Sequence, residues 1–348
     1  MRKIAKIKSF HNKHILITGA SFIGQHLIDK LITRGAGSIR VVNLTPANKY
    51  KLKKYLGDVE FIERDLRDLS NACKSVKGVD IVFHLAADHG GRGYVDLNQG
   101  STASNLLLDG SVFYAALQEG VEKIFFASSG CVYPNYLQKD VDKEIFLKET
   151  DVTSPYDADN MYGWAKLMGE MTLKAYYKDF GLKSAIGRFF TVYGESASES
   201  HAVMGSIAKA FVEQDPYLVW GNGSQVRNWT YVSDIVEGIL AATTNIDNAT
   251  PINLGTQERI SVSEMVELIF QNTGYRPKRI KYVNMPQGPV NRVASNTLAK
   301  NLLGWTPKYT FEEGLKKTID WYFETKDKEK IRKHLDSLLL GKKRKEQT

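Results

Sequence analysis

Cysteine is almost missing from the sequence. Cys73 and Cys131 are the only two among 348 residues, and two isolated cysteines provide neither a disulfide framework nor a metal-binding cluster. We therefore expect no metal site. Such sparse use of cysteine is typical of a chain that works in a reducing compartment, so the sequence predicts a cytoplasmic protein.

Long apolar runs are missing too, because no stretch approaches the roughly 20 residues that a membrane-spanning helix needs. The positively charged stretch MRKIAKIKSFHNKHILITG runs directly into a glycine turn. That arrangement predicts a first strand and argues against a signal peptide. We expect no membrane partner.

The sequence also lacks a motif that reads nucleic acid, although its net charge is +8. Nucleic-acid binding requires a basic patch with an aromatic platform or a reader motif, so we expect no nucleic-acid partner. Much of the charge lies at the two ends, in MRKIAKIK and GKKRKEQT. A solvated lysine-rich surface explains most of it, and a small anionic substrate such as a nucleotide is the simplest specific partner.

The first half of the sequence alternates short apolar runs with helical patterns. Near-continuous apolar strands joined by helices indicate a parallel sheet covered on both faces, which is an α/β fold with a doubly wound sheet. Gly35 and Gly120 follow two of the helices, as C-terminal glycines do. The expected strands lie near 14–19, 38–44, 59–66, 79–87, 122–129 and 182–189, and the expected helices near 23–35, 68–76, 101–119 and 160–180.

The alternation stops after about residue 187, where loop-rich stretches mix polar and aromatic residues. The sequence INLGT, near 252–256, is typical of one more strand that returns to the sheet. We therefore predict a large first domain, a smaller C-terminal α+β lobe that binds substrate, and a basic tail. The expected boundaries are 1–187 for the first domain with a returning segment near 232–256, 188–231 and 257–330 for the lobe, and 331–348 for the tail.

The segment HILITGASFIGQHL, residues 14–27, has the form of a phosphate-binding loop with one residue missing. Gly19 can make the tight turn and Gly24 can let a following helix pack closely on the strand, while Ser21 stands where a middle glycine is usual. Backbone N–H groups and the helix dipole would face a pyrophosphate. A glycine pair alone is a weak signal, so an ordinary strand–helix turn is the alternative.

Residues at the ends of the next strands add to this signal. An acidic residue at the end of the second strand normally binds the adenosine ribose of a dinucleotide, and Asn43 stands there in VVNLT. Asn43 can hydrogen-bond a ribose but does not repel a 2′-phosphate, so NAD is only weakly favoured over NADP. Residues 65–66 and 85–87 end the following two strands, at the edge where ligands of open sheets bind.

Tyr162 and Lys166, in MYGWAKLMGE, lie one helical turn apart and form a candidate catalytic pair. An ammonium beside a phenol favours the phenolate, so we expect the pKa of Tyr162 to fall and the phenolate to act as a general base for an alcohol. The spacing alone is weak, because tyrosine–lysine pairs at 50/54 and 322/326 share it. Only Tyr162 follows a strand that ends in FFASSG, which would place Ser129 beside the same substrate oxygen.

The chain resembles the extended short-chain dehydrogenase/reductase family in an ordered set of motifs: TGASFIG, RDL, HLAA, SNLLLDG, ASSGCVYP, YGWAK, GRFFTVYG, WGNGSQVRNWTYVSD and LGW. The match runs from about residue 14 to 325, and the ordered set is specific although each piece is not. Members of this family mostly act on nucleotide sugars. The resemblance implies a Rossmann domain that binds NAD, with NADP as the alternative, and a homodimer that pairs the helices near 101–119 and 160–180.

The resemblance also implies which residues contact the cofactor. They occupy the glycine turn, the ends of three strands, one position in SNLLLDG and the tyrosine–lysine pair: Gly19, Ser21, Phe22, Ile23, Gly24, Asn43, Asp65, Leu66, Leu85, Ala86, Ala87, Asn105, Tyr162 and Lys166.

Two details narrow the resemblance. ASSGCVYP places Cys131 two residues after Ser129, and LAADHGGRGY follows the fourth strand. Both features resemble the GDP-mannose 3,5-epimerases, and the GDP-L-fucose synthases share the cysteine motif. In both groups the cysteine is half of an acid/base pair, and SESHAVMGSIAKAF places His201 at the partner's position. The resemblance thus implies Cys131 and His201 as the pair that moves protons at ring carbons, with a packing cysteine and a surface histidine as the alternatives.

The substrate residues follow from the same resemblance. The family's phosphate clamps carry over to Arg227 and Arg292, because guanidinium groups match pyrophosphate geometry. Arg188 in GRFF is expected to be structural. Relatives usually have asparagine where this chain has a threonine in RFFTVYG, which leaves the identity of the substrate open. The sugar would contact Gly90, Gly91, Arg92, Ser129 and Thr191.

We therefore expect an NAD-dependent nucleotide-sugar epimerase that works through a transient 4-keto intermediate, on a GDP-hexose and with inversion at C3 and C5. Gly130-Cys131 stand where 4,6-dehydratases carry an acidic pair, which argues against dehydration. The alternatives are an NADPH-dependent epimerase-reductase of the fucose-synthase kind, a plain C4-epimerase and a cofactor-binding protein without catalysis. The shortened glycine loop predicts weaker cofactor binding than in relatives.

Overall fold

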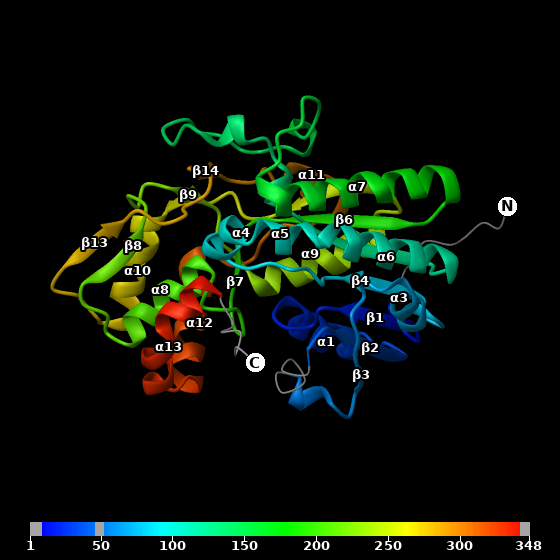
Figure 1. Ribbon diagram of the computed structural model, residues 1–348, viewed down its shortest axis with the longest axis horizontal. Coiled ribbons are helices and arrows are strands. Elements are labelled where there is room, and N and C mark those ends of the chain that lie inside the picture. Colours follow the sequence, from blue (N-terminus) through cyan, green and yellow to red (C-terminus); the bar gives the residue numbers. More distant parts are fainter. Residues whose placement is uncertain (1–8, 46–51, 342–348) are drawn as a thin grey trace.

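The computed structural model describes residues 9–45 and 52–341 of the chain. Tyr50 and the basic ends lie outside this described part. The centre is a seven-stranded parallel sheet with the order β11-β6-β5-β4-β1-β2-β3 (Figure 1). Its strands are β1 (His14–Thr18), β2 (Ser38–Asn43), β3 (Val59–Glu63), β4 (Ile81–His84), β5 (Lys123–Ser129), β6 (Ser184–Phe189) and β11 (Asn248–Leu254).

The order of the strands reverses beside β1. The chain runs outward from β1 to β2 and β3, and then crosses back to β4 on the other side of β1. Such a reversal opens a crevice at the carboxyl ends of the strands. The central strands carry apolar residues on both faces, as a covered parallel sheet requires, and every residue of β4 is buried. The predicted doubly wound sheet is confirmed.

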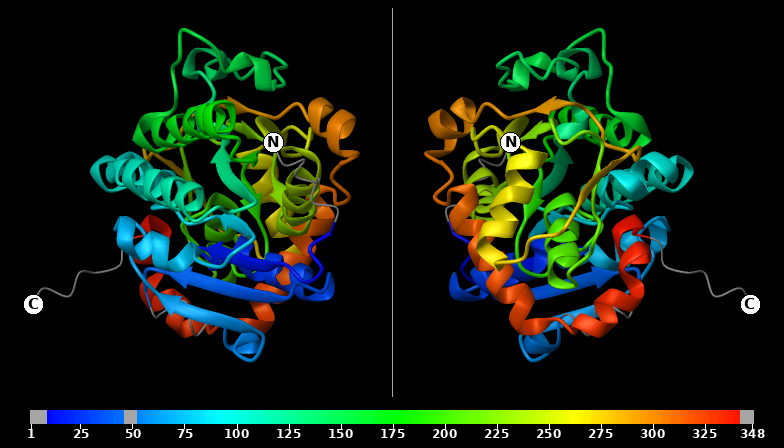
Figure 2. Two further views of the ribbon diagram at one scale, coloured as in Figure 1. Left: turned by 90° about the vertical axis from the view of Figure 1, so that its right-hand side faces the viewer. Right: turned by 90° about the vertical axis from the view of Figure 1, so that its left-hand side faces the viewer.

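Helices cover both faces of the sheet (Figure 2). Each one packs an apolar stripe against the strands; α1 does so with Leu27, Ile28 and Leu31. One face carries α1 (Ile23–Thr33), α9 (Val232–Asn245) and α11 (Thr297–Leu303), and the other carries α3 (Leu69–Val76), α6 (Asn105–Gln118) and α7 (Asn160–Phe180).

The helix expected over 101–119 is two helices. The short α5 (Gln99–Ala103) ends before Ser104, and α6 begins at Asn105. The side chain of Asn105 bonds both backbone groups of Asp88, accepting from its N–H at 2.7 Å and donating to its carbonyl at 2.9 Å. The interruption therefore brings the start of α6 against the loop that follows β4.

A smaller lobe follows β6, and β11 then returns the chain to the sheet beside β6, at the position expected from INLGT. The lobe contains three short sheets and several helices. Its strands are β7 (Val192–Tyr193) with β10 (Thr230–Tyr231), β8 (Tyr217–Trp220) with β13 (Ile280–Val283), and β9 (Val226–Arg227) between β12 (Ile260–Ser261) and β14 (Asn291–Arg292); its helices are α8 (Ala202–Phe211), α10 (Val262–Thr273) and α12 (Phe311–Thr325).

The predicted basic tail differs from the structure over its first ten residues. Residues 331–340 belong to α13 (Lys328–Leu340), which buries Ile331 and Leu335. Asp327 caps this helix by accepting a hydrogen bond from the N–H of Lys330 at 2.9 Å. The high lysine content led to the prediction of a tail, although the segment has an amphipathic pattern. Its apolar residues face α8 and its charged residues face water.

The remaining helical elements are short and lie in the connections. They are α4 (Arg92–Leu97) and four 3-10 turns, η1 (Lys53–Tyr55), η2 (Gly130–Val132), η3 (Asn135–Gln138) and η4 (Glu149–Asp151). Within the described residues, no helix combines the length and the apolar character needed to cross a membrane.

Candidate active site

A cleft of about 300 Å³ lies at the carboxyl edge of the sheet, where the order of the strands reverses. Its walls come from the β1–α1 turn, the loop after β4, the end of β5, the start of α7 and the segment before α8. The cleft continues into a hollow of about 100 Å³ between α8, β8 and α10. Both the large domain and the smaller lobe therefore line one continuous site.

The β1–α1 turn faces this cleft through Ser21, Phe22 and Ile23. Gly19 makes the turn with φ +75°, and a Cβ atom at this position would lie 2.5 Å from Cα of Ala86. Only glycine satisfies both conditions. No side chain caps the N-terminus of α1, so its first N–H groups are available to an anion.

The end of β2 carries an unsatisfied polar group. Asn43 is buried, and its Nδ2 finds no hydrogen-bond partner within the described part of the chain. A buried donor without a partner is costly, and its position at the end of β2 is where a dinucleotide places its adenosine ribose. The turn at Gly19 and the donor on Asn43 therefore fit a bound dinucleotide.

Several residues predicted to contact the cofactor do not line the cleft. Asn105 is fully buried, with its amide committed to Asp88. Leu66 packs in the core under α3 and α6. Asp65 forms an ion pair with Arg67 at 2.6 Å. The cleft is lined directly by the predicted cofactor residues Gly19, Ser21, Phe22, Ile23, Leu85, Ala87 and Tyr162.

Lys166 belongs to a chain of buried polar groups that reaches the β1–α1 turn. Its Nζ lies 3.5 Å from Oδ2 of Asp109, and Oδ1 of Asp109 lies 2.9 Å from Nε2 of His84. Nδ1 of His84 lies 2.7 Å from the hydroxyl of Thr18. Burial lowers the pKa of Lys166 and that of His84, while Asp109 acts in the opposite direction on both.

Tyr162 lines the cleft. The prediction that its pKa falls is wrong in this structure. Burial raises the pKa of Tyr162 above its ordinary value, and the charges of Cys131 and Asp109 raise it further, while a hydrogen bond from Ser129 lowers it. Lys166 does not offset burial, because its Nζ lies 6.0 Å from the Tyr162 ring and faces Asp109 and Phe126.

Cys131 lies beside Tyr162 because two backbones touch. A Cβ atom at Gly163, in the first turn of α7, would collide with the carbonyl oxygen of Cys131. Ser129 accepts a hydrogen bond from the N–H of Cys131 at 3.1 Å. These contacts fix Ser129, Cys131 and Tyr162 along one wall of the cleft, where the sequence motifs place them.

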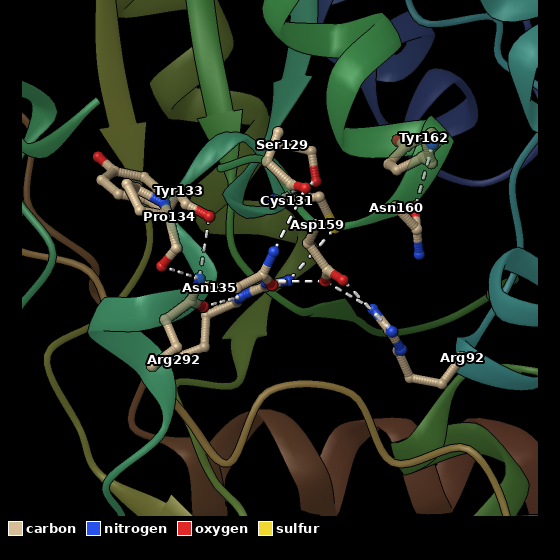
Figure 3. Close-up of polar contacts among 12 residues, drawn as sticks. Arg92, Ser129, Cys131, Tyr133, Pro134, Asn135, Asp159, Asn160, Tyr162 and Arg292 are labelled. Carbon is tan, nitrogen blue, oxygen red and sulfur yellow. Dashed lines mark hydrogen bonds and ion pairs between the residues drawn. The ribbon is translucent and has the colours of Figure 1, made fainter. Parts of the chain in front are cut away.

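Three arginines, Arg92, Arg227 and Arg292, line the same cleft. Figure 3 shows two of them, Arg92 and Arg292, pointing toward Asp159. Asp159 joins two of them, at 2.6 Å from Nη1 of Arg92 and 2.9 Å from Nη2 of Arg292. Burial opposes ionisation of Asp159, yet Arg292 and Arg92 outweigh it and hold the pKa of Asp159 below its ordinary value. Arg292 also donates to Sγ of Cys131 at 3.2 Å.

Arg227, the third arginine, donates to two backbone carbonyls, those of Val226 and Gln287. Burial and the charges of Arg292 and Arg92 lower the pKa of Arg227 to about 9. Asp159 and Asp96 neutralise part of this positive charge, but within the described part of the chain three guanidinium groups meet only these two carboxylates. The cleft is therefore suited to an anionic ligand. Arg188, by contrast, is fully buried against Glu170 at 2.7 Å, as its predicted structural role requires.

His201 lies at the N-cap position of α8 and lines the same cleft as Cys131. Burial, followed by the charge of His89, lowers the pKa of His201 to about 4. Thr191 also lines the cleft and has φ +25°, which is rare for a β-branched residue. Asparagine adopts positive φ more readily, so the threonine here carries backbone strain.

Three polar residues of the site, His89, Asp109 and Asp159, were not predicted from the sequence. His89 lies within LAADHGGRGY, directly before Gly90, and Asp159 lies three residues before Tyr162. Asp109 is five residues into α6 and shows no periodic signal that separates it from a solvent-facing carboxylate. Only the fold reveals that it meets Lys166 and His84.

The buried pairing of Asp109 with Lys166 leads to a prediction about stability. In Asp109→Asn the Lys166 pKa should fall further, because burial acts without the opposing carboxylate. We expect a loss of about 3 kcal/mol in the free energy of unfolding at pH 7. A folded-state pKa below that of the unfolded chain makes stability rise with pH, so the loss should shrink as pH increases toward 10.

Urea denaturation at pH 7, 8.5 and 10 measures this effect. Asp320→Asn is the matched control, because Asp320 pairs with Lys316 at 3.4 Å in an exposed position and should cost at most about 0.5 kcal/mol at every pH. A loss in Asp109→Asn that stays constant between pH 7 and 10 would show that Lys166 is not the group affected.

Comparison with known proteins agrees with this geometry. Residues 15–255 match the NAD dependent epimerase/dehydratase family. The chain is 35% identical over 326 residues to GDP-mannose 3,5-epimerase 1 of Oryza sativa subsp. japonica, covering 91% of this chain and 83% of that protein. It is 33% identical to a putative UDP-glucose 4-epimerase of Methanocaldococcus jannaschii, covering 88% of this chain and 97% of that protein.

A solved structure with a similar fold is that of UDP-glucose 4-epimerase from Thermotoga maritima with UDP-glucose. It aligns with a TM-score of 0.80 and 28% identity, covering 90% of this chain and 99% of that one. The family match spans the sheet, the glycine turn and the tyrosine–lysine pair. The chain therefore belongs to the NAD dependent epimerase/dehydratase family and is an enzyme of the extended short-chain dehydrogenase/reductase type.

Proposed function

We propose that the protein is an NAD-dependent nucleotide-sugar epimerase that inverts C3 and C5 of a GDP-linked hexose through a 4-keto intermediate. The observation that carries the proposal is the meeting of two sets of residues in one cleft. Ser129 and Tyr162 would act at C4, and Cys131 and His201 would act at the neighbouring carbons C3 and C5. A C4-epimerase needs only the first set.

The cofactor site would be formed by the β1–α1 turn, Asn43 and Lys166. The free N–H groups at the start of α1 would bind the pyrophosphate, and Nδ2 of Asn43 would donate to a ribose hydroxyl. Bound NAD⁺ would supply reversible hydride transfer at C4 of the sugar. Nζ of Lys166 is held by Asp109 at 3.5 Å and lies 6.0 Å from the centre of the Tyr162 ring.

Tyr162 would remove the proton of the C4 hydroxyl as the carbonyl forms, with Ser129 donating a hydrogen bond to the same oxygen. The high pKa of Tyr162 keeps the phenol protonated in the structure described here. The Ser129 hydroxyl, whose hydrogen bond lowers the pKa of Tyr162, opposes the effect of burial and would favour proton removal at this position.

Cys131 and His201 would move protons at C3 and C5, whose hydrogens become acidic beside the ketone. The pKa of His201, about 4, keeps its imidazole neutral at pH 7, so His201 starts as the proton acceptor. The thiol of Cys131 would then donate to the opposite face of the carbon, and Arg292 stabilises the thiolate that is left. Each inversion consumes no redox equivalent.

The GDP-linked substrate is supported by the GDP-mannose 3,5-epimerase at 35% identity and by the anion-binding character of the cleft. Arg227 and Arg292 would bind the pyrophosphate. The sugar would contact Arg92 and the backbone of Gly90 and Gly91. The M. jannaschii relative is a putative UDP-glucose 4-epimerase, which keeps UDP-sugars among the substrates to be tested.

Incubation with GDP-mannose in deuterated water tests the reaction. The wild-type enzyme should incorporate deuterium at C3 and C5, and the sugar products should be identified by NMR. Cys131→Ser and His201→Asn should slow incorporation by roughly 100-fold or more, since each removes a proton-transfer group. Cys73→Ser is the control and should incorporate at the wild-type rate, because Cys73 lies in α3 away from the cleft.

The outcomes separate the rival functions. Inversion at C4 without deuterium at C3 or C5 would identify a plain C4-epimerase. Cys131→Ser would then keep nearly the wild-type activity. Stoichiometric loss of absorbance at 340 nm would identify an NADPH-dependent epimerase-reductase. Absence of turnover with every nucleotide sugar, despite bound cofactor, would identify a binding protein without catalysis.

The end of β2 leads to a prediction about cofactor choice. Asn43 carries no charge and does not repel a 2′-phosphate, so NAD⁺ and NADP⁺ should bind with affinities that differ by less than about tenfold. Asn43→Asp should add roughly tenfold preference for NAD⁺, about 1.4 kcal/mol, by repelling the phosphate. Calorimetric titration of both cofactors measures this, with the exposed Asn245→Asp as the control. An unchanged ratio in Asn43→Asp would place the ribose elsewhere.

The protein is further proposed to be a homodimer that pairs α6 and α7 across a two-fold axis. These neighbouring helices expose large apolar side chains, with Leu107 58% and Trp164 38% accessible, and such a patch is typical of an interface. Leu107→Glu should convert the dimer to a monomer in analytical ultracentrifugation, while Leu302→Glu, on the far side of the sheet, should not. A wild-type chain that sediments as a monomer would exclude this dimer.

A further inference from the structure

Two imidazoles lie side by side in the cleft, and the proposed reaction uses only one of them. The ring centroids of His89 and His201 are 5.9 Å apart, with 43° between the ring planes. A direct hydrogen bond or one bridging water can join ring nitrogens at this separation. Both rings line the cleft, and His89 is exposed on its open side.

The two loops that carry these rings are locked to each other. Gly91 touches the carbonyl of Ser200, which a Cβ atom at this position would overlap. Asp88 is held by three hydrogen bonds. Two join its backbone to the side-chain amide of Asn105, and the hydroxyl of Tyr94 donates the third to its carboxylate at 2.6 Å. The separation of the two imidazoles is therefore set by backbone contacts on both sides.

The surroundings keep both imidazoles neutral at pH 7. The walls of the cleft, followed by the charge of Lys166, lower the pKa of His89 below its ordinary value, although the residue keeps access to solvent. The pKa of His201 is about 4, and the charge of His89 contributes to it. Neither ring can hold a proton for long, and a proton on one ring opposes a proton on the other.

We propose that His89 is a proton-relay residue that carries protons between His201 and the water of the cleft. The inference rests on the proposed function, because it assigns the step that restores His201 after each inversion. His89 acts through His201 and does not touch the ring carbons. Its exposure to the cleft argues against a role as packing for the core.

The relay restores the proton count of the site. After one inversion His201 holds the proton removed from carbon, and Cys131 is a thiolate because it gave a proton to the opposite face. The N–H bond on His201 then breaks as one forms on a ring nitrogen of His89, either directly or through one bridging water. The second nitrogen of His89 releases its proton to water, and Cys131 takes a proton from water. One proton leaves, one enters, and no electrons are transferred.

The first test needs no substrate. Ring ¹⁵N NMR of the full chain follows the titration of His89 and His201 between pH 3 and 8. In His89→Gln the pKa of His201 should rise, because the neighbouring positive charge is lost. His334→Gln, an exposed histidine on α13, should leave it unchanged. A His201 titration that is identical in wild type and His89→Gln would overturn the pairing.

The second test uses GDP-mannose in deuterated water. In His89→Gln and His89→Ala, incorporation at C3 and C5 should fall about 10-fold to 100-fold, while KM and the single-turnover formation of NADH at 340 nm stay within twofold of wild type. Added imidazole should restore His89→Ala by about tenfold and have no effect on His334→Ala. The relay is wrong if incorporation is unchanged, or if NADH formation falls in parallel with it.

The two tests separate failure of the relay from failure of the proposed function. If the wild-type enzyme incorporates no deuterium from solvent at C3 or C5, the proposed epimerisation fails and the relay fails with it. If the wild-type enzyme incorporates deuterium and the His89 variants match it, the epimerisation stands and only the relay fails.

Discussion

The site is organised by one buried chain of polar contacts, from Thr18 through His84 and Asp109 to Lys166. It joins β1, β4, α6 and α7 at the edge of the sheet where the strand order reverses. Because each member is buried, no member can be lost without leaving a partner unsatisfied. The same contacts set the distance between the glycine turn and Tyr162, which is the distance that a dinucleotide has to span.

Close contacts between backbone segments also fix the positions of the residues in the cleft. Gly19 lies against Ala86, Gly91 against Ser200, and Gly163 against Cys131, and at each of these places a side chain would separate two walls of the cleft. The reacting groups are thus held by main chain on both sides, which limits how far they can drift. Side-chain packing alone would leave them more freedom.

Much of the fold could be predicted from the sequence, because the apolar strands and helix-terminating glycines such as Gly35 and Gly120 are local signals. The motifs placed Ser129, Cys131, Tyr162 and His201, all of which line the cleft. The sequence could not show that Asp109 would engage Lys166, since a carboxylate on a helix is ordinarily solvated. For the same reason the pKa of Tyr162 was predicted in the wrong direction, because burial is a property of the fold.

Because Asp159 pairs with two arginines of the cleft, an anionic ligand has to replace its carboxylate in order to bind them. In the structure its carboxylate satisfies both Arg92 and Arg292. A pyrophosphate that engages Arg292 must compete with that carboxylate, so the gain in binding is the difference between two anions and not the full attraction of one. The ion pairs of Asp159 would therefore limit the affinity of the cleft for any ligand that needs the same arginines.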